Sequence, residues 1–405
     1  MTSRQRYSMG PAALVAAAFI GPGTVITASL AGANFAYALM WALVFSVIAT
    51  MVLQEMAARL GVVTQQGLGE NIRAMAVRPW LRWLLLTLVV GAVVIGNSVY
   101  QGGNLSGASM GLADLVQRTA IPASWLPLII GAIAALVLAS GSYRVIEKVL
   151  IALVLLMSIA FVGTFILTQP DWPALFKGLL WPSLPAGSIL TVVALIGTTV
   201  VPYNLFLHAS SAAQKWHNVS DLAAARRDLA LSIPLGGLIS VAIVGTAAAA
   251  FFGQAMQLES AADLGQALRP LFGDYAGYLM AIGLFAAGIS SALTAPLASA
   301  YALSGVLGFK ADLSSWPFRL TWGVILVIGI VIASSGFRPV SVIWFAQVAN
   351  GLLLPMIAVF LLWACNQQRL GEQRNSRRQN ALAMVVVVIA IGLGVRSLAS
   401  AFGLL

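Results

Sequence analysis

The chain has 405 residues, of which 60% are hydrophobic and 8% charged, and its mean hydropathy is +0.94. Soluble globular chains carry about 25% charged residues, so a soluble fold of this length would lack polar residues to cover its surface. The formal net charge of +10 comes from basic residues in short loops rather than on one basic face. These observations argue against a nucleic-acid partner and predict membrane lipid as the main surroundings.

The first apolar run follows only two basic residues, Arg4 and Arg6. No small-residue cleavage site follows it at signal-peptide distance, so we expect this run to remain as a membrane helix. The single cysteine, Cys365, allows neither an internal disulfide nor a cysteine metal cluster. No cofactor is expected.

Along the chain, eleven mostly apolar stretches are long enough to span a bilayer. They cover residues 11–34, 36–58, 83–112, 122–141, 145–168, 187–212, 229–253, 275–305, 319–336, 339–364 and 380–402. The third and eighth are long enough to be tilted or broken. The sequence therefore predicts an all-α integral membrane protein with about 11 transmembrane helices in a single transmembrane domain, residues 1–405.

The basic residues predict the orientation of these spans through the positive-inside rule. With the N-terminus in the cytoplasm, 17 of the 22 Lys and Arg residues fall on the cytoplasmic side. The other five are Arg118, Lys177, Arg269, Arg338 and Arg396. We therefore expect a cytoplasmic N-terminus and an external C-terminus, in the inner membrane of a bacterium. The sequence predicts no oligomeric state.

Two spans are interrupted at proline, the first at Gly21–Thr24 (Gly-Pro-Gly-Thr) and the sixth at Val201–Asn204 (Val-Pro-Tyr-Asn). Because they lie five spans apart, two five-span units of opposite topology are expected. Repeat one would cover about 11–168 and repeat two about 187–364, followed by an extra helix at about 380–402. Paired breaks in inverted repeats indicate a transporter's binding site. Two ordinary proline kinks are the alternative.

A broken membrane helix exposes backbone carbonyls that attract cations and backbone N–H groups that attract anions. Two glycines flank the first proline and let the backbone unwind close to a ligand. The breaks also supply a hydroxyl, a phenol and an amide. We therefore predict substrate-binding positions at Gly21, Gly23, Thr24, Val201, Tyr203 and Asn204.

In the third span, Asn97, Tyr100, Gln101 and Asn104 share one helix face. Polar groups inside a membrane span usually face the bundle or a cavity, which would place them on a transport pathway. Hydrogen bonding between helices is the alternative. Nearby, a Gly-x-Ser-x-Gly pattern at Gly107–Gly111 lies in an apolar helix rather than after a strand, so it does not indicate an enzyme.

All twelve acidic residues fall in loops or near predicted helix ends. Ca²⁺ and Mg²⁺ sites normally use carboxylates, and Mn²⁺ follows the same preference. A divalent cation at the breaks would therefore bind weakly and keep part of its water shell. The alternative substrate is a small neutral or anionic solute, such as an amino acid, held by N–H groups.

The breaks and their surroundings resemble the Nramp metal-ion transporters, whose first helix carries Asp-Pro-Gly-Asn and whose sixth carries Met-Pro-His-Asn. Further similar segments are Ala58–Thr64, Asn204–Ser210, Gly283–Ser291, and Gln347 with Leu354 and Pro355. The resemblance implies a LeuT-like fold of five plus five inverted spans and one extra helix. It also implies secondary active transport of a metal cation by alternating access, coupled to a proton or sodium ion.

This chain departs from that family where the metal ligands lie. The family's Asp is Gly21, its first Asn is Thr24, its Met is Val201 or Val200, and its His is Tyr203. The metal ligands are therefore unknown, and the alternative of a neutral or anionic solute stays open.

The polar residues that match the family are Asn204, His208 and Gln347. The match implies a pathway role for His208 and Gln347. His208 would relay protons there, since its unperturbed pKa is near neutral; a neutral, structural histidine is the alternative.

Overall fold

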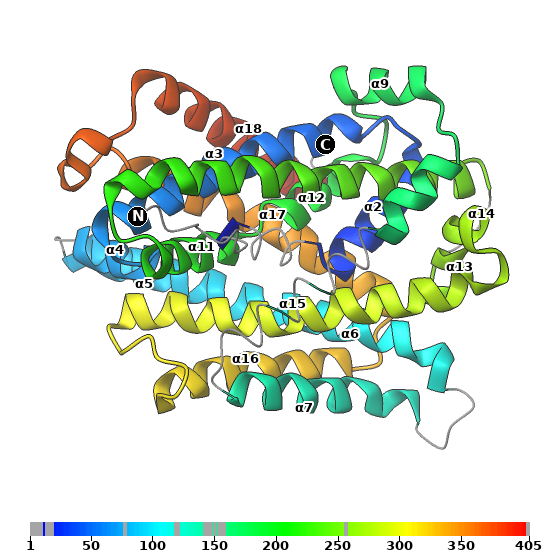
Figure 1. The fold of residues 1–405 in the computed structure, drawn as a ribbon, viewed down its shortest axis with the longest axis horizontal. Helices are drawn as coiled ribbons and strands as arrows, with labels where there is room; N and C mark the ends of the chain where they lie inside the picture. The colour runs from blue at the N-terminus through cyan, green and yellow to red at the C-terminus, as the bar shows by residue number, and fades with distance from the viewer. Residues whose placement is uncertain are drawn as a thin grey trace, which may run out of the picture.

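The structure, a computed structural model, describes residues 11–12, 20–75, 79–116, 122–140, 148, 152, 159–254 and 258–401. Regular structure in these residues is helical throughout, and the longest helices lie side by side in one bundle (Figure 1). The buried core consists mainly of apolar side chains, together with a smaller set of buried polar ones. The all-α prediction is therefore confirmed.

Seven helical stretches in the described residues are long and apolar enough to cross a membrane. They are Met40–Thr64, Ile189–Lys215, Val219–Phe251, Ala261–Leu307, Trp316–Ala333, Pro339–Ala364 and Arg377–Ser397. The main helices within them are α3 (Met40–Thr64), α10 (Ile189–Thr199), α11 (Pro202–Lys215), α12 (Leu222–Phe251), α15 (Ala276–Leu307), α16 (Trp316–Ala333), α17 (Pro339–Ala364) and α18 (Arg377–Ala401).

The other described helices complete the spans or connect them. They are α2 (Pro22–Phe35), α4 (Leu68–Met75), α5 (Pro79–Val90), η1 (Gly91–Gly96), α6 (Asn97–Val116), η2 (Ala123–Trp125), α7 (Leu126–Ala139), α9 (Trp172–Leu180), η3 (Val219–Asp221), α13 (Ala261–Gly265), η4 (Gln266–Leu268), α14 (Arg269–Phe272), η5 (Gly273–Tyr275) and η6 (Gln368–Gln373). Much of the predicted fifth span, and residues 13–19 of the first, lie outside the described residues.

The second and third predicted spans differ from the helices found. The second span was expected to end at residue 58, but α3 continues to Thr64. The charge of Arg59 does not end it, because this buried side chain pairs with Glu55 and donates to the Gln373 carbonyl. The third span is irregular, as its length suggested: a π-helical segment, η1, joins α5 to α6. Segments of this kind are frequent at functional sites.

The sixth span is broken between α10 and α11. α10 ends at Thr199, and Val200 and Val201 leave the helical conformation, with φ −81° and ψ 122° at Val201. Proline at the first position of α11 fits this geometry, because its missing N–H has no helical partner to lose. The predicted break is confirmed, although Tyr203 and Asn204 belong to the first turn of α11 rather than to unwound backbone.

The first span is non-helical at the matching place. Ile20 and Gly21 form a bend, with φ −110° and ψ −172° at Gly21, and α2 begins at Pro22. The N–H groups of Thr24 and Val25 both donate to the Gly21 carbonyl. Gly23 and Thr24 therefore lie in the first helical turn, and the unwound backbone is shorter than predicted.

Glycines on α6 let neighbouring helices approach the break closely. A Cβ at Gly107 would collide with the ring of Pro22, and one at Gly111 with the backbone of Ala281. A side chain at either position would push α2 or α15 away. These two glycines of the third span thus form a packing surface, and Gly107 lets α6 lie directly against the broken first span.

Candidate functional site

The two broken spans are joined directly by a hydrogen bond between threonine hydroxyls. Thr24 Oγ1, in the first turn of α2, lies 2.8 Å from Thr198 Oγ1, in the last turn of α10. Both side chains are fully buried. Each comes from the helical end next to its break, so the contact brings the two breaks together at one centre.

Tyrosine and serine side chains from the third and eighth spans surround Gly21. A Cβ on Gly21 would overlap Ser291 Oγ and lie 3.7 Å from Tyr100 Oη. The rings of Tyr100 and Tyr203 are tilted by 60°, with centroids 5.3 Å apart. Tyr100, on α6, therefore stands between the two breaks. Because glycine has no side chain, position 21 leaves room for the hydroxyl groups of Ser291 and Tyr100.

On the opposite side, the tenth span contributes the amide of Gln347. A Cβ on Gly23 would overlap this side chain, and one on Gly197 would overlap the Gln347 carbonyl oxygen. Gln347 Nε2 donates to the Ile343 carbonyl at 3.3 Å. Its Oε1 is buried and has no hydrogen-bond partner among the described residues. An acceptor oxygen thus lies beside the first break.

Asn204 is fully buried in the first turn of α11. Within the part of the chain that the structure describes, neither its Oδ1 nor its Nδ2 has a hydrogen-bond partner. An unpaired buried amide is costly and rare, which is typical of a group that binds something.

His208 lies one turn further along α11 and is also fully buried. Its Nδ1 lies 2.7 Å from Gln54 Oε1 on α3. A carbonyl oxygen can only accept, so Nδ1 carries the proton and Nε2 keeps its lone pair. Nε2 has no partner among the described residues.

The polar face of the third span is buried as a whole, and its members differ in role. Asn97 Nδ2 donates to Ser299 Oγ at 2.6 Å, and Gln101 Nε2 donates to the Ala292 carbonyl at 3.1 Å. These two bonds hold α6 against α15, as the hydrogen-bonding alternative expected. Gln101 Oε1 and Asn104 Nδ2 have no partner in the described residues.

The centre is electrically neutral apart from its helix ends. α2 and α11 begin there, while α10 ends there, so exposed N–H and carbonyl groups face the same space. No group of three or more His, Cys, Asp or Glu side chains that could hold a metal occurs within the described ranges. The donors present are hydroxyls, amides and backbone carbonyls.

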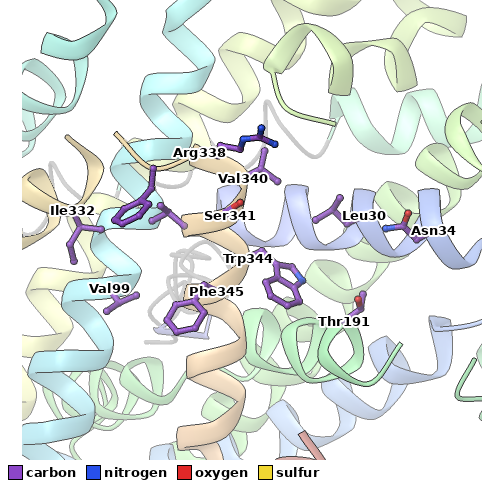
Figure 2. Close-up of a pocket in the computed structure, with 12 residues that line it drawn as sticks. Leu30, Asn34, Val99, Thr191, Ile332, Arg338, Val340, Ser341, Trp344 and Phe345 are labelled. Atoms are coloured by element: carbon purple, nitrogen blue, oxygen red, sulfur yellow. The ribbon is translucent and has the colours of Figure 1, made fainter. Parts of the chain in front are cut away.

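A cavity of about 890 Å³ lies on the predicted outer side of this centre. Figure 2 shows its side chains converging from α2, α6, α10 and α17, with Arg338 at one end. Leu30, Thr191 and Trp344 are one to two helical turns from Thr24, Thr198 and Gln347 respectively. Arg338 is bound to Glu259, with 2.6 Å between Nη1 and Oε1.

The fold defines the class of protein. The structure aligns with a manganese transporter of Eremococcus coleocola, crystallised with an aromatic bis-isothiourea compound, at a TM-score of 0.78 and 25% identity, covering 97% of this chain and 86% of that one. It aligns with Mhp1, a nucleobase-cation-symport-1 family transporter, at a TM-score of 0.63 and 15% identity, covering 97% and 93%. The chain is an all-helical membrane transporter with a LeuT-like fold and not an enzyme.

The sequence narrows this class to a family. Residues 12–400 match the Nramp family, described as natural resistance-associated macrophage protein-like, and the chain belongs to it. A relative in Klebsiella pneumoniae named divalent metal cation transporter MntH is 30% identical over 410 residues, covering 95% of this chain and 92% of that protein. The MntH of Yersinia pestis is 29% identical over 395 residues, covering 95% and 93%.

The structure gathers Gly21, Gly23, Thr24, Tyr100, Tyr203 and Gln347 around one centre, with Val201 and Asn204 beside it. Asn97 and Gln101 are engaged with α15 instead. Sequence reasoning missed Thr198 and Gln54 as members of this region. Thr198 lies three residues before the Val-Pro break. This short distance from the break could have indicated that its hydroxyl belongs to the site.

Proposed function

We propose that the chain is a secondary active transporter that moves a divalent metal cation across the membrane by alternating access. The cation would bind where the two broken spans meet, between repeats at about 11–168 and 187–364. One observation carries the proposal: the fully buried Asn204 amide, unpaired among the described residues, beside the junction made by Thr24 and Thr198. The relatives named as metal transporters support the choice of substrate.

We further propose that this member is divergent at the metal site. Gly21 and Thr24 stand where the resemblance expects Asp and Asn, and Val200 or Val201 where it expects Met. The remaining donors are neutral oxygens, which attract a divalent cation far less than carboxylates do. The cation would therefore keep part of its water and bind with millimolar affinity, with Thr24, Tyr203 and Asn204 as its side-chain contacts.

The outer cavity favours a second candidate, transport of a small neutral or anionic solute. Most of its lining side chains are apolar, including Leu30, Trp344 and Phe345, and Arg338 is its charged lining residue among the described ones. Apolar walls offer a bare cation no ligands and suit an organic solute. Transport of a hydrated cation remains the first proposal because the relatives and the family agree on metal.

Coupling to a proton or sodium ion belongs to the same proposal. His208 supports a route for protons. Its Nε2 has no hydrogen-bond partner among the described residues and can accept a proton, and the residue lies one helical turn from Asn204. The basic residues support a cytoplasmic N-terminus. The bacterial relatives support a location in the bacterial inner membrane.

Uptake of Mn²⁺ into proteoliposomes containing the purified chain tests the function. Saturable uptake above that of empty vesicles is expected, and Asn204→Ala should abolish it without unfolding the protein. Amino-acid uptake with no Mn²⁺ uptake would favour the second candidate. Restoring the acid requires two changes, because a Cβ at position 21 overlaps Ser291 Oγ. Gly21→Asp combined with Ser291→Ala should therefore bind Mn²⁺ more tightly than either single variant.

A further inference from the structure

A second polar cavity, of about 410 Å³, lies away from the helix breaks, between α4 and the end of α15. Both elements reach the end of the bundle where α11 also ends, which is the predicted cytoplasmic side (Figure 1). The lining residues are Gln66, Glu70, Arg73, Ala74, Ser304, Gly305, Gly308 and Phe309. The central site does not use any of them.

Glu70 is the carboxylate of this cavity, and it is largely enclosed. A Cβ at Gly305 or at Gly67 would overlap or crowd Glu70 Oε2, so two glycines make room for the group. Oε2 has no hydrogen-bond partner among the described residues. Burial raises the pKa of Glu70 above its usual value, although the backbone N–H groups of Glu70 and Gly67 oppose this.

The carboxylate faces the C-terminal end of a long helix. α15 has 32 residues and ends at Leu307, and the following residue, Gly308, takes a left-handed conformation with φ +85°. The last carbonyl groups of a helix carry partial negative charge and attract cations. A carboxylate beside such an end is repelled by it unless positive charge is nearby, and the guanidinium of Arg73 supplies part of that charge. Ser304 adds a hydroxyl oxygen, which donates to the Tyr301 carbonyl and can still accept.

Two arginines border the cavity. The guanidinium of Arg73 lies against Gly308, where it partly neutralises the end of α15. Arg369 donates to Gln66 Oε1 at 2.9 Å. Neither forms an ion pair with Glu70 within the described structure. Their positive charge lowers the affinity of the cavity for a cation. Low affinity suits a site from which a cation is released.

The cavity lies beside α11, the same helix that begins at the central break. Gly67 packs against Ser210, which lies on α11 two residues after His208 and six after Asn204. Six residues of helix rise about 9 Å. Glu70 and Ser210 both lie against Gly67, so this carboxylate is next to α11 on the predicted cytoplasmic side of the break.

We propose that this cavity is a cytoplasmic binding site for a divalent metal cation leaving the central site, with Glu70 as its charged ligand and the end of α15 supplying neutral oxygens. The proposal rests on the proposed function for the origin of the cation. The structural alternative is that Glu70 only caps α4, since it reaches back to the Gly67 N–H from the third helical position.

Paramagnetic broadening by Mn²⁺ separates these two roles because it detects weak binding directly. A fluorine label on Ala74→Cys would report from the cavity edge, where Ala74 is exposed, while the native Cys365 is buried. In the purified full chain, Mn²⁺ should broaden the label signal with a saturable dependence. Glu70→Gln keeps an oxygen for the cap but removes the charge, and should raise the half-saturating concentration about tenfold, about 1.4 kcal/mol.

Three further variants make the result decisive. Arg73→Gln leaves Glu70 in place and should lower the half-saturating concentration. Glu372→Gln removes an exposed carboxylate on the same predicted side and should change nothing. Asn204→Ala should also leave the titration unchanged, which distinguishes failure of this site from failure of the proposed central site. Identical titrations for the unaltered chain, Glu70→Gln and Arg73→Gln would overturn the proposal and leave Glu70 as a cap.

Discussion

Replacing Asn204 with leucine should stabilise the folded protein and stop transport. In the described structure neither polar atom of the buried Asn204 amide is hydrogen-bonded. A buried polar group without a partner costs about 1–3 kcal/mol, and leucine nearly preserves the volume. Allowing about 0.5 kcal/mol for the changed shape, we expect a net gain of about 0.5–2.5 kcal/mol, which raises Tm by about 1–3 °C in a chain of this length.

Transport should change in the opposite direction. A hydrogen bond to a charged ligand contributes about 1.5–3 kcal/mol, so its loss lowers substrate affinity by about tenfold or more. The assay pairs thermal unfolding of the purified protein with Mn²⁺ uptake per folded molecule. Thr27→Val is the matched control, since Thr27 is equally buried on α2 and its hydroxyl has no partner in the described residues.

The control should become more stable and keep its transport. A fall in Tm for Asn204→Leu with unchanged uptake would show that the amide supports the fold, and the site assignment would be wrong. Equal losses of uptake in Asn204→Leu and Thr27→Val would show that a more stable helix bundle transports less, whichever buried polar group is removed. The site assignment would then be unsupported.

Three other predictions concern the same machinery. Thr24→Val and Thr198→Val should each cost about 0.5–1.5 kcal/mol, and the double variant no more than either one, as a double-mutant cycle would measure. Gly23→Ala should slow Mn²⁺ uptake by pressing on Gln347, and adding Gln347→Ala should restore part of it. Burial raises the pKa of Glu70, so as the pH falls this carboxylate should take up a proton at a higher pH than an exposed carboxylate would. Mn²⁺ bound at Glu70 should be lost over the same pH range. Repeating the broadening titration at several pH values checks this.

The features that the sequence predicted best are those that depend only on residues close together in the chain. Proline with glycine or a polar residue marks a place where a membrane helix cannot continue, and both breaks occur there. Apolar length predicted α17 to the residue, at 339–364. These features depend on a few neighbouring residues, so they can be predicted without knowledge of the packing.

Features that depend on distant partners could not be predicted in the same way. Arg59 resembled the end of a span, yet α3 continues past it because Glu55, Gln373 and Asn375 satisfy its charge. Thr198 joins the centre only because α10 ends beside α2. The polar stripe of the third span was correctly assigned to one buried face. Which of its members bond to α15 depends on the register of α6 against α15.

The concentration dependence of Mn²⁺ uptake tests the central claim most directly. Proteoliposomes containing the unaltered chain should take up Mn²⁺ with a half-saturating concentration in the millimolar range, because neutral oxygens alone replace part of its water shell. Asn204→Leu should remove this uptake while the protein stays folded. Uptake no greater than that of empty vesicles would contradict metal transport, and half-saturation in the micromolar range would contradict a site built without a carboxylate.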